Sequence, residues 1–85
     1  MMDKYLILYG DDEFISITAD SLKECITSFA IWCGDDSPLF EKAMLRMETP
    51  DEIVGLFERF SYTRIQAIMK ISETVYGGVR SYGQN

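Results

Sequence analysis

The chain has 85 residues, 47% of them hydrophobic, and a formal net charge of −6 at pH 7. This composition predicts one packed domain and excludes a disordered acidic tail. All of the excess negative charge falls in residues 1–36, which hold eight acids and two bases, whereas residues 37–85 hold six of each. An acidic stretch of this kind favours basic partner surfaces and disfavours the phosphate backbone of nucleic acids.

Two short β-rich runs come first, KYLILY at residues 4–9 and EFISITA at residues 13–19. Apolar and polar side chains alternate in the second run, as expected of a half-buried strand. Residues 10–12 (GDD) tolerate the backbone angles of a tight reversal. We therefore predict an antiparallel β-hairpin over about residues 4–19, with a solvated, acidic tip.

Capping signals mark three helix starts, in which a Ser or Thr precedes a Glu or a Pro in the first turn. They predict helices over about residues 21–34, 37–48 and 49–60, and each segment has apolar residues at helical spacing. Trp32 lies off the apolar stripe of the first helix, so its ring is either partly exposed or shielded by another element.

Residues 63–76 fit two patterns. Apolar residues alternate over 63–71 as in a strand, but good helix formers and the Gly77-Gly78 stop favour a helix. We predict a helix over about 63–76, followed by a tail over 77–85. The expected fold class is α+β, with an N-terminal antiparallel β-hairpin packed on three or four short helices in a single domain, residues 1–85.

Residue types used in catalysis and metal binding are few. The chain has no histidine, and Cys25 and Cys33 are eight residues apart in one predicted helix. At ~1.5 Å per residue their Cα atoms lie ~12 Å apart, beyond the ~7 Å limit for a disulfide. The two GDD tripeptides, at residues 10–12 and 34–36, continue into no calcium-binding loop, and a polymerase needs a far longer chain. We expect no enzymatic activity, no metal and no cofactor.

The first candidate site is therefore a protein-binding surface formed by acidic loops and an aromatic anchor. Tyr5, Tyr9 and Tyr62 are further candidate anchors. We expect a small non-enzymatic protein-binding module, an inhibitor or modulator that docks its acidic face on a basic, nucleic-acid-binding surface, as small phage or mobile-element proteins do. The alternative is that the acids only keep the protein soluble. The candidate partner-binding residues are Asp11, Asp12, Glu13, Trp32, Asp35 and Asp36.

Two other functions fit the sequence. Residues 51–60 and 63–76, joined by a short break, match a helix-turn-helix, and residues 61–85 carry a local charge of +2. The DNA-contacting residues would be Thr63, Arg64, Gln66 and Lys70. The other alternative is a homo-oligomeric structural component, with a homodimer as its simplest form. We expect a cytoplasmic location, because no apolar run approaches the ~20 residues needed to span a bilayer.

Overall fold

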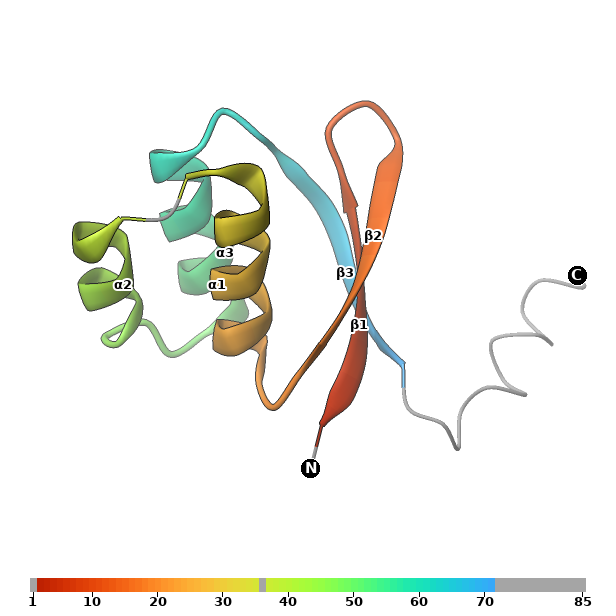
Figure 1. Cartoon of the computed structure of the whole chain (residues 1–85), viewed down its shortest axis with the longest axis horizontal. Coiled ribbons are helices and arrows are strands. Elements are labelled where there is room, and N and C mark those ends of the chain that lie inside the picture. Colours follow the sequence, from red (N-terminus) through yellow and green to blue (C-terminus); the bar gives the residue numbers. More distant parts are fainter. Residues whose placement is uncertain (1, 36, 72–85) are drawn as a thin grey trace, which may run out of the picture.

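The structure, a computed structural model, describes residues 2–35 and 37–71. Within them the chain is of the α+β class, with three strands and three helices (Figure 1). In chain order they are β1 (Asp3–Tyr9), β2 (Glu13–Ala19), α1 (Leu22–Cys33), α2 (Pro38–Met44), α3 (Pro50–Phe60) and β3 (Ile65–Ile71).

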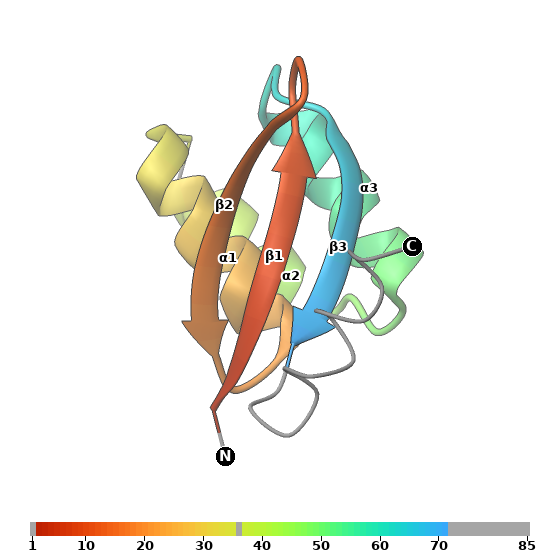
Figure 2. The ribbon, with the colours of Figure 1, turned by 90° about the vertical axis from the view of Figure 1, so that its right-hand side faces the viewer.

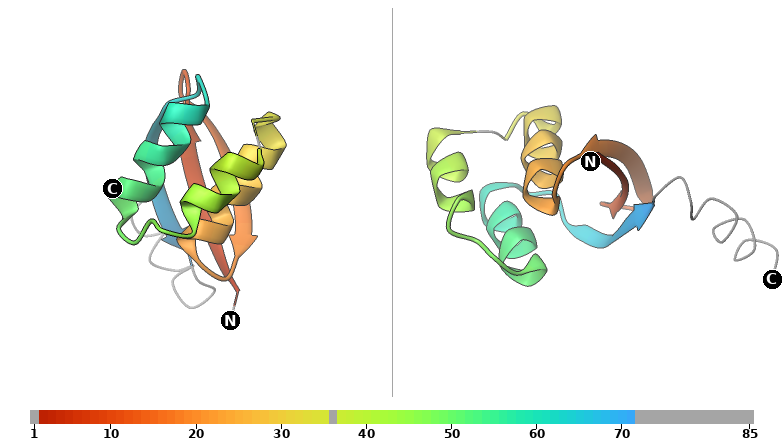
Figure 3. Two further views of the ribbon diagram at one scale, coloured as in Figure 1. Left: turned by 90° about the vertical axis from the view of Figure 1, so that its left-hand side faces the viewer. Right: turned by 90° about the horizontal axis from the view of Figure 1, so that it is seen from below.

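The sheet is antiparallel, with the strand order β2-β1-β3, so the N-terminal strand lies in the centre. The helices lie on one face of the sheet, as the view onto its other face shows (Figure 2). Helices α1 and α3 are next to the sheet, and α2 packs on these two helices from the far side (Figures 1 and 3).

The hairpin turns through residues 10–12, where the backbone enters the left-handed region twice. Gly10 has a φ of 58° and Asp12 a φ of 64°. Glycine and, to a lesser degree, aspartate accept these angles, which explains why this tripeptide can reverse the chain between β1 and β2.

Each helix begins at a hydroxyl-bearing N-cap. The side chains of Ser21, Ser37 and Thr49 accept hydrogen bonds from backbone N–H groups in the first turn. Thr49 and Glu52 form a reciprocal capping box at the start of α3. Helix α1 ends at Gly34, whose left-handed φ of 81° ends the helix with two backbone hydrogen bonds.

The predicted helix over 63–76 is wrong for residues 65–71, because these form β3. β1 is the central strand, and β3 supplies the backbone partners for the edge that β2 leaves open. Pairing in the sheet outweighs the helix propensity of this segment. The third strand thus follows the helices, and the sheet is larger than the predicted hairpin. Residues 72–76 and the predicted tail over 77–85 lie outside the described residues.

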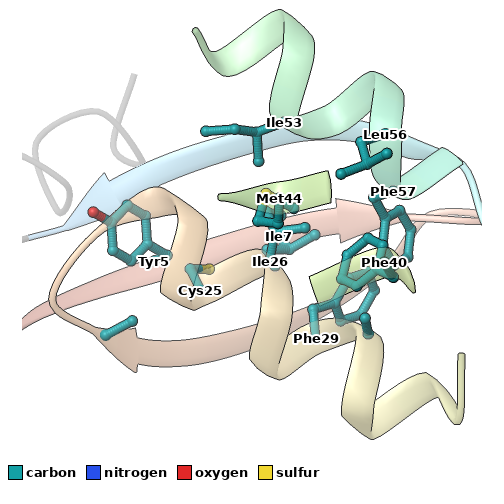
Figure 4. Close-up of a cluster of buried hydrophobic side chains, with 12 residues drawn as sticks. Tyr5, Ile7, Cys25, Ile26, Phe29, Phe40, Met44, Ile53, Leu56 and Phe57 are labelled. Carbon is teal, nitrogen blue, oxygen red and sulfur yellow. The ribbon is translucent and has the colours of Figure 1, made fainter. Parts of the chain in front are cut away.

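The hydrophobic core lies between the sheet and the helices (Figure 4). Phe29 of α1 stacks on Phe57 of α3 with ring centroids 5.2 Å apart, and both side chains are fully buried. The Cys25 thiol is part of this core, and burial raises its pKa to about 11. Both cysteines are free thiols.

Candidate protein-binding site

Three connecting segments meet at one end of the molecule, at the top of Figure 1. The backbone N–H of Gly10 in the hairpin donates to the carbonyl oxygen of Arg64, at 2.9 Å. The Ser61 hydroxyl donates to Oδ2 of Asp35, at 2.7 Å. We call this end, made of residues 9–13, 32–35 and 61–64, the loop end.

The loop end carries four carboxylates from two separate loops. Asp11, Asp12 and Glu13 are exposed and Asp35 is half-buried. Within the described part of the chain, none of the four forms an ion pair. Arg64 is the one cationic residue in the three segments of the loop end, which gives them a formal charge of −3. Asp36, the other predicted acid, lies outside the described residues.

Trp32 lies at the same end of the molecule, and two aromatic side chains contact its ring. Its ring stacks on Phe29 at a centroid distance of 5.9 Å and meets Tyr9 edge to face at 6.0 Å. Even so, 59% of the residue is exposed. An aromatic side chain that is held in place and still exposed loses little entropy on binding, which suits it to anchor a partner.

The predicted tyrosine anchors differ in exposure. Tyr62 is fully exposed at the loop end, next to Ser61. Tyr5 is 6% exposed and belongs to the core, because its side chain faces the helices from β1. The loop end therefore offers Trp32 and Tyr62 as accessible aromatic groups.

Tyr9 and Cys33, the tyrosine and the thiol next to Trp32, remain neutral near pH 7. Desolvation, the Glu13 charge and a hydrogen bond to Glu13 all raise the pKa of Tyr9. Desolvation and the Asp35 charge raise the pKa of Cys33, and a hydrogen bond to Thr63 lowers it in part. Because the thiolate is the reactive form of cysteine, Cys33 is a weak nucleophile in this environment.

The other described acids of the first 36 residues lie at the opposite end of the sheet. Asp3 pairs with Lys70 of β3 at 3.4 Å. Glu24 accepts a hydrogen bond from the backbone N–H of Asp20 at the start of α1. The acidic stretch of the sequence is thus divided between two ends of the sheet, and four of its carboxylates lie at the loop end.

The candidate DNA-contacting residues do not form one cluster. Thr63 and Arg64 lie at the loop end, and the side-chain amide of Gln66 at the start of β3 donates to the Gly10 carbonyl there, whereas Lys70 lies near the other end of β3. At ~3.3 Å per strand residue, Arg64 and Lys70 are ~20 Å apart along the chain. Because residues 65–71 form a strand, the second helix of the predicted helix-turn-helix is not present there.

The described residues contain neither a metal-binding cluster nor a membrane-spanning helix. Residues 2–35 and 37–71 hold no group of three or more acidic or cysteine side chains that could bind a metal ion. Among the same residues, no helix is long and apolar enough to cross a membrane.

Comparison with known proteins gave no match to any family model, curated protein or solved structure. The geometry of the loop end is therefore the basis for its proposed role.

Proposed function

We propose that the protein is a small non-enzymatic binding module whose loop end docks on a basic surface of another protein. The observation that supports this most is that an exposed indole, stacked on Phe29, lies at the same end of the molecule as four carboxylates that form no ion pair within the described residues. A nucleic-acid-binding surface of the partner has the required charge, so occupying it would inhibit or modulate that partner.

The proposed binding has two stages. Long-range attraction between the loop end and the basic surface speeds the encounter, and it acts over ~8 Å at physiological salt. Burial of Trp32 and Tyr62 then slows dissociation, because exposed aromatic anchors contribute much of the binding energy at protein interfaces. Charge thus sets the association rate, and the aromatic side chains set the lifetime of the complex.

A charge-reversal pair tests the first stage. Asp11→Lys and Glu48→Lys both change the net charge from −6 to −4. Asp11 lies at the loop end, whereas Glu48 precedes the N-terminus of α3, and each is exposed. We immobilise each full-length variant, capture partners from a lysate of the source cells, and measure association of the retained protein at 0.05 and 0.5 M salt.

We expect Asp11→Lys to slow association about tenfold at low salt, with a much smaller effect at high salt. Glu48→Lys should remain within a factor of about two of the wild type, because only the charges facing the partner matter. Equal effects of the two variants would mean that the acids act through net charge alone. That result would mean that the carboxylates of the loop end only keep the protein soluble.

A further inference from the structure

A groove of about 480 Å³ lies between β3 and the first half of α3. The two elements run side by side along one edge of the sheet (Figure 2). The volume is within the usual range of ligand pockets. The apolar residues that line the groove come from four elements and are Tyr5, Leu22, Pro50, Val54, Ile65 and Ile68.

The groove follows a strand edge that is open in the described part of the chain. β3 pairs with β1 along one edge, and the strand order leaves its second edge without a neighbouring strand. At the start of this second edge the backbone N–H of Ile65 points toward α3 and donates to Oε2 of Glu58 at 2.8 Å. The Glu58 carboxylate occupies the place that a carbonyl oxygen of a further strand would take.

The charges around the groove lie at its borders. Lys70 and Asp51 are among its lining residues, and Glu58 closes the Ile65 end. Lys70 is already paired with Asp3. The remaining border charges are therefore carboxylates, which suit an occupant with an apolar centre and basic flanks.

We infer that the groove binds an extended peptide segment of a partner protein, which adds a fourth strand to β3. Successive side chains of a strand point to opposite faces, so apolar residues at every second position would enter the groove. The stretch of β3 that borders it, Ile65 to Lys70, accommodates a segment of about six residues, ~20 Å long. Backbone hydrogen bonds to β3 would align the segment, as in other complexes formed by strand addition.

The inference does not depend on the proposed function of the loop end. The groove ends at Ile65, next to the loop end, but the α3 residues that line it, Pro50, Asp51 and Val54, belong to the first half of that helix, whereas the loop end begins after α3. One surface can fail its test while the other passes.

The probe is a synthetic peptide, acetyl-Lys-Val-Thr-Val-Thr-Val-Lys-amide, with a fluorescent label. Two isomers each carry two backbone N-methyl groups, either on the first two valines or on the two threonines. Successive N–H groups of a strand point to opposite edges, so only one isomer loses the donors that face β3. Binding to the full-length chain is measured by fluorescence anisotropy, and its location by amide chemical shifts in a nuclear magnetic resonance titration.

We expect the unmethylated peptide and one isomer to bind with affinities within threefold of each other, and the other isomer to bind at least tenfold more weakly. Shifts should be concentrated in β3 and the first half of α3. Equal affinity of both isomers, or no binding at millimolar peptide, would overturn the inference.

Matched variants locate the site. Val54→Gln places a polar group in the groove and should weaken binding at least tenfold, whereas Leu45→Gln, at an exposed position after α2, should leave it unchanged. Thermal melting verifies that both variants fold. If Asp11→Lys weakens binding and Val54→Gln does not, the peptide binds the loop end, which overturns this inference and agrees with the proposed function.

Other occupants give distinct results, and each would also contradict the inference. Slow hydrogen exchange of the outer β3 amides in the free protein would mean that the groove is already filled. If the protection of the outer β3 amides from hydrogen exchange increases with protein concentration, a second copy of the chain fills the groove. If this protection is independent of concentration, residues of the same chain fill it.

Discussion

Cys33, at the C-terminal end of α1, reports on the charge of its surroundings. The thiol is half-buried, and Asp35 and Thr63 both influence it. Desolvation and the Asp35 charge raise its pKa more than the Thr63 hydrogen bond lowers it. The thiol titration therefore provides a local measure of the field that Asp35 contributes at the loop end.

We predict that alkylation of Cys33 by iodoacetamide is slow at pH 8 and that its rate still rises above pH 9. Asp35→Asn should move the pH–rate profile of Cys33 toward lower pH, because a negative charge near the thiol disfavours the thiolate. Peptide mass mapping separates Cys33 from Cys25, whose pKa of about 11 makes it the slower thiol. A Cys33 profile identical in the wild type and Asp35→Asn would contradict the placement of that charge.

The helices and β3 differ in how local their signals are. The hydroxyl of an N-cap bonds a backbone N–H three residues away, so Ser21, Ser37 and Thr49 carry their signals within the sequence itself. Residues 65–71 carry no such signal. Their strand state depends on β1, which lies some 60 residues earlier. A sequence window contains the alternation of the segment but not its pairing partner.

The same difference applies to the candidate sites. The acidic hairpin tip could be predicted because its residues are adjacent in the sequence. The approach of Arg64 and Ser61 to that end could not, because it depends on the return of the chain from α3 to β3. The groove could not be predicted either, since a helix over 63–76 offers no strand edge. The alternation of apolar residues over 63–71 is the one signal in the sequence that indicates this strand.

The capping box of α3 gives a prediction for this element. Thr49→Ala should lower the free energy of unfolding by about 1 kcal/mol, because the Glu52 backbone N–H loses its acceptor. Thr27→Ala is the matched control, since its hydroxyl bonds the Lys23 carbonyl within α1 and alanine favours helix. Urea unfolding should show a clear loss for the first variant and little change for the second.

Glu52 adds a pH dependence to the same element. The backbone N–H groups of Glu48 and Thr49 donate to its carboxylate and hold its pKa below the ordinary value of 4.5. A carboxyl group with a lowered pKa in the folded state stabilises the fold fully above its unfolded pKa. That stabilisation is lost as the pH falls through the folded pKa. Glu52→Gln should therefore reduce the fall in unfolding free energy between pH 6 and 3, and an unchanged fall would contradict the capping box.

The uncovered face of the sheet carries several apolar side chains. Its central strand presents Leu6 and Leu8, with Phe14 of β2 and Met69 of β3 beside them, and the last two are more than half exposed. The homodimer that the sequence allows stays a prediction.

On the scale of the whole molecule, negative charge is distributed unevenly. The described acids of the first 36 residues fall into two groups at opposite ends of the sheet. The group with exposed Trp32 lacks ion pairs in the described residues, and the other is engaged with Lys70 and the start of α1. Because the chain has one tryptophan, its fluorescence reports on the loop end alone.

The most direct measurement is quenching of the Trp32 fluorescence by caesium and by iodide ions at low salt. The central claim is that the loop end combines exposed carboxylates with an accessible indole, so caesium should quench more efficiently than iodide relative to free tryptophan. The preference should shrink in 0.5 M salt and in Asp11→Lys, and persist in Glu48→Lys. If both ions quench Trp32 equally at low salt, each relative to its quenching of free tryptophan, or if neither ion quenches it, the claim is contradicted.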